Sequence, residues 1–174
     1  MLDPLRSGVR FLAQNDLATI LREFSRRDTH PFLQFCKYGL CGCVGVTIHM
    51  VIFYLLASSP LLPSLDNSLI DGEPISDSLR ARNATLNNFI GWLIANAVVY
   101  LLNARWVFQP GRHGKWLEFG LFTLVSFIAF LGGILGGPLL IRFFGINTHL
   151  SQVLFVITST LVNYLCRKFL IFKG

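Results

Sequence analysis

The chain has 174 residues, of which 53% are hydrophobic and only 14% are charged. A soluble domain carries about a quarter of its residues as charged side chains, and here residues 44–59, 86–104, 119–141 and 143–166 contain none. Each charge-free run, with its flanks, approaches the ~20 apolar residues that span a bilayer, and in lipid such runs form helices that satisfy their own backbone. These features exclude a soluble globular domain and predict an all-α membrane protein.

Residues 1–30 are predicted to lie outside the membrane. Leu17, Ile20, Leu21 and Phe24 repeat at helical spacing with arginines off that stripe, which predicts an amphipathic helix on the cytoplasmic leaflet. A frayed tail is the alternative. Pro31 permits a change of direction before the first span.

Four transmembrane helices are predicted at residues 33–57, 86–108, 117–141 and 150–172, within one membrane domain of residues 31–174. The first apolar run is too long for the core of a secretory signal peptide, so we interpret it as an anchor. Most of the 15 lysine and arginine residues fall in the N-terminal segment, in the loop between the second and third spans, and at the C-terminus. By the positive-inside rule both termini are therefore expected in the cytoplasm, and the net charge of +6 needs no nucleic-acid partner.

An internal similarity relates the two halves of the membrane domain. A shift of 64 residues places 99–108 on 163–172 and Asn88 on Gln152. This pattern predicts a parallel 2+2 repeat, in which spans one and two resemble spans three and four, as occurs in transporters. The alternative is that cytoplasmic helix ends converge on aromatic and basic residues in any case.

Polar residues within spans usually face the bundle interior, and they are the candidate binding residues. A groove that could pair with hydroxyl groups is predicted from Asn88, Asn96, Gln152, Ser159, Asn163 and His49. A cationic rim that could hold a phosphate is predicted from Asn103, Arg105, Arg167 and Lys168. The competing interpretations are interhelical hydrogen bonds that hold the bundle together, a packed histidine, and basic side chains that reach the membrane surface.

Enzymatic chemistry has little support in the sequence. There is no nucleophile with an arranged base, no pair of carboxylates in a span and no glycine-rich phosphate loop. The four cysteines lack metal-ligand spacing, so neither a metal nor another cofactor is expected. In the third span, Gly132, Gly133, Gly136 and Gly137 permit close helix packing, and Pro138 is expected to kink or end that helix.

Over residues 32–172 the chain resembles the GtrA-like family. The resemblance lies in the segment from Phe32 to His49, in 103–108 at the end of the second span, and in 163–172. Ala104, Arg167 and Leu170 depart from the residues common in that family, which bears on head-group contacts.

The resemblance implies a four-span protein of the bacterial inner membrane that takes part in cell-surface polysaccharide or glycolipid synthesis. It implies translocation of a polyprenyl-phosphate-linked sugar, beside the glycosyltransferase that makes it. A homodimer is expected, since four short helices enclose little volume. The alternatives are a non-catalytic scaffold for that glycosyltransferase and, with weaker support, a small exporter of cationic drugs, which would need an acid deep in a span.

Overall fold

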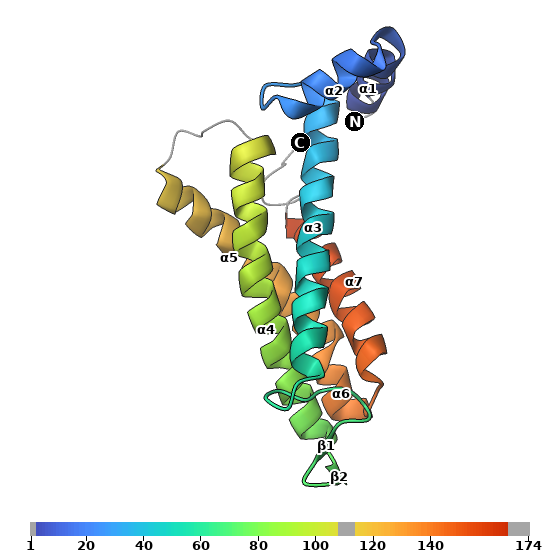
Figure 1. The fold of residues 1–174 in the computed structure, drawn as a ribbon, viewed down its shortest axis with the longest axis vertical. Helices are drawn as coiled ribbons and strands as arrows, with labels where there is room; N and C mark the ends of the chain where they lie inside the picture. The colour runs from blue at the N-terminus through green and yellow to red at the C-terminus, as the bar shows by residue number, and fades with distance from the viewer. Residues whose placement is uncertain (1–2, 108–113, 167–174) are drawn as a thin grey trace.

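A computed structural model of the chain describes residues 3–107 and 114–166. The described part is almost entirely helical (Figure 1), with one short β-hairpin. The elements in chain order are α1 (Asp3–Gln14), α2 (Leu17–Ser25), α3 (Pro31–Ala57), β1 (Leu69–Ile70), β2 (Glu73–Pro74), α4 (Asp77–Leu102), the π-helical turn η1 (Asn103–Val107), α5 (Lys115–Gly136), α6 (Pro138–Phe144) and α7 (Thr148–Cys166).

Three stretches of helix in the described part are long and apolar enough to cross a membrane: Pro31–Ala57, Asp77–Val107 and Trp116–Phe144. The apolar part of α7, Thr148–Val162, is shorter than a span. The fourth predicted span, 150–172, continues beyond the described residues. Several apolar helices of this length make the chain a multi-pass integral membrane protein.

The helix boundaries follow from local capping chemistry. Pro31 occupies the first turn of α3, where its missing N–H costs nothing. The Ser76 hydroxyl accepts a hydrogen bond from the Leu79 N–H, so α4 begins at Asp77 and extends the helix ahead of the span predicted from residue 86. Gly137 and Pro138 divide the third predicted span into α5 and α6, and Gly145, with a φ of 60°, ends α6.

The N-terminal segment contains two helices where the sequence pattern predicts one. Asp16 separates them and caps α2 by accepting a hydrogen bond from the Thr19 N–H. This bond to the ionised carboxylate holds the pKa of Asp16 below its usual value. In α2, Ile20 and Phe24 are half-buried, whereas Leu17 and Leu21 remain exposed.

The bundle is built from two closely packed helix pairs, α3 with α4 and α5 with α7. Glycines allow the close approach. A Cβ at Gly45 of α3 would collide with Val99 of α4, and a Cβ at Gly136 of α5 would collide with Thr158 of α7. In Figure 1, α5 crosses behind α4, and the N-terminal end of α5 lies apart from α4.

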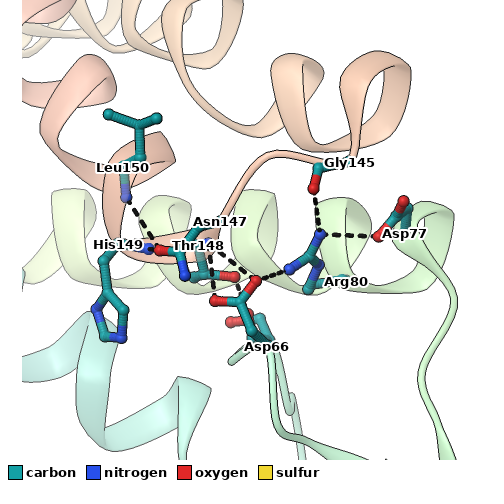
Figure 2. A network of polar contacts seen from close by, with 9 residues as sticks. Asp66, Asp77, Arg80, Gly145, Asn147, Thr148, His149 and Leu150 are labelled. Atoms are coloured by element: carbon teal, nitrogen blue, oxygen red, sulfur yellow. Dashed lines mark hydrogen bonds and ion pairs between the residues drawn. The ribbon is translucent and has the colours of Figure 1, made fainter.

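A polar network fastens the α3–α4 loop and the α6–α7 corner to the start of α4 (Figure 2). Arg80 binds the carboxylates of Asp66 and Asp77, and donates to the Gly145 carbonyl oxygen at 3.3 Å. Asp66 also accepts a hydrogen bond from the Thr148 N–H at 3.0 Å. This end of the bundle, which we call the loop end, is therefore closed by long-range polar contacts.

Candidate functional site

A cavity of about 500 Å³ lies among α3, α4, α5 and α7. It is mostly apolar, and several of its lining residues, among them Gly42, Val46, Leu121 and Thr160, are exposed, so it opens to the protein surface. Its size falls within the ~300–1,000 Å³ typical of small-molecule sites.

Apart from Tyr38 and Trp92, whose rings carry polar atoms, five side chains give the cavity its polar character. They are His49, Asn96, Ser126, Ser159 and Thr160. The Asn96 amide nitrogen donates to the Thr123 hydroxyl at 2.9 Å, but its buried Oδ1 has no hydrogen-bond partner within the described structure. A buried carbonyl is costly to leave unpaired, so Asn96 would be stabilised by a ligand hydroxyl or amide that reached this oxygen.

Trp92 forms part of the aromatic wall of the same cavity. Its indole Nε1 donates to the Ser126 hydroxyl at 2.9 Å, and its ring packs against Phe130 with 5.2 Å between centroids. The ring is therefore held in one orientation. A fixed aromatic surface beside amides and hydroxyls suits a ligand with both apolar faces and polar edges, as a sugar has.

A buried polar cluster joins α3, α4 and α7 on the loop-end side of the cavity. The Asn88 Oδ1 accepts hydrogen bonds from His49 Nε2 at 2.8 Å and from Gln152 Nε2 at 2.9 Å. The Asn88 Nδ2 donates to Gln152 Oε1 at 3.1 Å and to the Ala84 carbonyl oxygen at 2.9 Å. Asn88 thus uses both donors and both acceptor positions of its amide.

At the opposite end, helix α4 finishes in the π-helical turn η1. Asn103 is buried and donates to the Val99 carbonyl oxygen at 2.9 Å, while its Oδ1 lacks a described partner. The side chain of Arg105 is exposed, and its backbone oxygen accepts a hydrogen bond from Arg27 Nε. Single π-helical turns leave backbone groups displaced from the regular ladder and are frequent at functional sites.

The C-terminal end of α2 is docked onto η1 and α3. Trp106 Nε1 donates to the Phe24 carbonyl oxygen at 3.1 Å, and the two rings meet edge to face at 5.3 Å. The fully buried Lys37 donates to the Arg26 carbonyl oxygen, and its ammonium lies 5.7 Å from each of these ring centroids. The N-terminal segment is therefore in contact with the membrane domain.

The predicted site residues fall into three groups in the structure. His49, Asn96 and Ser159 line the cavity, and Asn88 and Gln152 are bonded to each other beside it. Asn103 and Arg105 lie together in η1. The side chain of Asn163, and Arg167 and Lys168, lie outside the described residues.

Sequence reasoning passed over four residues that the geometry singles out: Trp92, Ser126, Thr160 and Lys37. Trp92 carries no signal that separates it from ordinary packing residues in a span, whereas Ser126 and Thr160 are polar residues within predicted spans, as Ser159 is. Lys37 also carried a signal, because a cation inside the first span is costly and tends to mark function.

The described residues hold no group of three or more histidine, cysteine, aspartate or glutamate side chains placed to bind a metal ion. What the cavity can offer is hydrogen bonding and aromatic packing. Its chemistry suits binding of an amphiphile with a polar head.

Comparison with known proteins gives one finding. Residues 37–172 match the family described as GtrA/DPMS, transmembrane domain, which covers most of the chain. Neither a curated protein nor a solved structure matches significantly. The chain therefore belongs to the GtrA/DPMS transmembrane-domain family, and so to the membrane proteins that take part in glycolipid and polysaccharide synthesis.

Proposed function

We propose that this protein moves a polyprenyl-phosphate-linked sugar across the bilayer for cell-surface polysaccharide or glycolipid synthesis, without catalysing a covalent step. The observation that carries the proposal is the surface-open cavity lined by Asn96, whose buried Oδ1 has no hydrogen-bond partner among the described residues. A lipid-linked sugar can enter from the membrane without leaving its apolar tail in water. Its hydroxyl groups then replace water with protein partners, which lowers the cost of crossing hydrocarbon.

The side chains that line the cavity suit a sugar better than a second lipid tail. The amide and hydroxyl groups of Asn96, Ser126 and Ser159 can pair with hydroxyls, and Trp92 offers an aromatic face. A drug cation would be better served by a carboxylate, and no aspartate or glutamate among the described residues lines the cavity. The exporter hypothesis is weaker for that reason.

We further propose that the two halves of the membrane domain are related to each other as a parallel 2+2 repeat. It is supported by the two packed pairs, α3 with α4 and α5 with α7, and by the hydrogen bonds between Asn88 and Gln152, which the 64-residue shift aligns. In the proposed arrangement both termini are cytoplasmic, α2 lies on the cytoplasmic leaflet through Leu17 and Leu21, and two copies associate in the bacterial inner membrane.

The test is translocation in reconstituted vesicles. Asn96→Leu keeps a similar volume and favours membrane insertion, yet it removes the side-chain carbonyl. We expect it to abolish protein-dependent movement of a short-chain polyprenyl-phosphate hexose, measured by protection of the sugar from an impermeant oxidant. Thr85→Val on the same helix is the matched control, because Thr85 bonds only to the Ala81 carbonyl oxygen and does not line the cavity.

Translocation by Asn96→Leu at the parental rate would contradict the cavity assignment. A scaffold for a polyprenyl-phosphate glycosyltransferase would then be the better function. One observation favours that second candidate: α1 and α2 present exposed Leu12, Leu17 and Leu21, a surface on which an enzyme could dock. Under that function, deletion of residues 1–28 abolishes association with the enzyme and Asn96→Leu does not.

A further inference from the structure

The most unusual charged group in the described structure is Lys37. Its side chain is completely buried, although it lies in the second turn of a membrane-spanning helix. An ammonium group withdrawn from water requires compensation by an opposite charge or by several hydrogen bonds. The compensation present here is incomplete.

The partners of the Lys37 ammonium are one backbone carbonyl oxygen, that of Arg26, and the faces of Phe24 and Trp106. An ammonium has three N–H donors. None of the salt bridges among the described residues includes Lys37, and Glu23, the nearby acid of α2, is paired with Arg26 at 3.2 Å. Dipoles and ring faces therefore contact the charge, and no carboxylate among the described residues forms an ion pair with it.

The atoms that cover Lys37 belong to a segment held by few contacts. Arg26 and Phe24 end α2, which is fixed to η1 by the Trp106 and Arg27 hydrogen bonds. Arg26 and Arg27 are themselves exposed. A movement of this short helix would uncover a cation that lies among further basic side chains, an environment that attracts anions.

Lys37 is also aligned with the cavity along α3. It shares one face of the helix with Gly45 and His49, at steps of eight and four residues, and its neighbour Tyr38 lines the cavity. At 1.5 Å per residue, Lys37 is about 12 Å along the helix axis from Gly45. A phosphate at Lys37 therefore leaves an attached sugar within reach of the end of the cavity that Tyr38 lines.

We propose that Lys37 is a binding residue for the phosphate group of a membrane lipid, and that the end of α2 covers it when no ligand is bound. A phosphate oxygen takes the place of the Arg26 carbonyl oxygen as acceptor and supplies the missing negative charge. Binding then releases the end of α2. This inference rests on the proposed function, since it assigns the phosphate of that substrate to a residue distinct from the exposed Arg105.

The test measures binding of a short-chain polyprenyl phosphate to the purified full-length protein in detergent micelles. We expect Lys37→Gln to weaken binding at least tenfold and Lys37→Arg to retain it. The unphosphorylated polyprenol should bind equally weakly to all variants. Arg22→Gln, an exposed arginine of α2, is the matched control for loss of a positive charge. Saturation by inorganic phosphate alone, with equal affinity, would show that the site binds free phosphate and would overturn the assignment to a lipid.

A second variant separates a phosphate site from a purely structural lysine. Phe24→Ala removes part of the cover and leaves Lys37 in place. If Lys37 binds phosphate, Phe24→Ala binds polyprenyl phosphate as tightly as the parent or more tightly, the opposite of Lys37→Gln. If Lys37 only holds α2 down, both variants loosen α2 and have the same effect on binding, which overturns the proposal. Phe24→Ala remains informative even where Lys37→Gln fails to fold.

The outcome for the proposed function is distinguishable. If Lys37→Gln binds normally while Asn96→Leu abolishes translocation, the Lys37 assignment is wrong and the translocator function stands. If the parental protein binds no polyprenyl phosphate, both are overturned.

Discussion

The hydrogen-bonded cluster of His49, Asn88 and Gln152 allows a quantitative test of how the helices are held together. Asn88 is its centre, because its amide bonds to side chains on both other helices. Interhelical hydrogen bonds in membrane bundles contribute ~0.6–1.7 kcal/mol each. Asn88→Leu loses the contacts to both helices, so we expect a loss of ~2–3 kcal/mol in unfolding free energy, which includes the unpaired partners left behind.

Gln152→Leu removes fewer of the hydrogen bonds in this cluster, since His49 keeps its bond to Asn88. We expect it to cost ~1–2 kcal/mol. The two substitutions should not be additive, because each single change strands a partner that the double change also removes. The double variant is therefore expected to lose ~2–3 kcal/mol, with a coupling energy of ~1–2 kcal/mol between the sites.

The assay is equilibrium unfolding of the purified protein in mixed micelles, with helical content as the signal. Asn88→Leu combined with Ser159→Ala is the control pair, since Ser159 donates only to the Val156 carbonyl oxygen of its own helix. That pair should be additive. Additivity of Asn88→Leu with Gln152→Leu as well would refute the hydrogen bonding between α4 and α7 on which this reasoning depends.

Three further predictions test the packing, the loop end and the orientation. Gly136→Ala should destabilise the α5–α7 pair by ~1–3 kcal/mol because its Cβ collides with Thr158, whereas Gly120→Ala, with open space at that position, should be neutral in the same unfolding assay. Arg80→Met should lower the unfolding free energy by ~1–3 kcal/mol, because Asp66 and Asp77 lose their ion-pair partner. Exposed Arg82→Met is the neutral control, and equal stability of the two variants would contradict the network of Figure 2. In a cysteine-free background, an impermeant thiol reagent added to intact cells should label Asn67→Cys and spare Gly114→Cys, and labelling at position 114 would invert the proposed orientation.

Much of the helical architecture was predictable because it depends on local composition. The first span was expected at 33–57 and is observed as Pro31–Ala57, since one uninterrupted apolar run there is bounded by Pro31. The break in the third span was expected from Pro138 and occurs at Gly137. Both features follow from the requirements of the backbone itself.

The features that were missed depend on contacts between distant parts of the chain. The start of α4 ahead of the predicted second span was not predicted, because it places Arg80 in a buried position where it pairs with Asp66 of the preceding loop. The burial of Lys37 depends on Phe24 and Trp106, which come from two other elements. No spacing rule along one helix reports such partners.

Two asparagines of α4 differ in their expected roles, one structural and one in ligand binding, because they occupy different positions in the bundle. The sequence places Asn88 and Asn96 on the same helix face, about 12 Å apart at 1.5 Å per residue. Asn88 has both oxygen acceptor positions and both donors occupied by the protein, so it has nothing left to offer a ligand. Asn96 lines the cavity, its nitrogen is fixed by Thr123, and its buried oxygen has no partner among the described residues. Because an amide held at one end and unpaired at the other is pre-oriented for a ligand, Asn96 is the residue whose loss should affect the substrate, and Asn88 the residue whose loss should affect the fold.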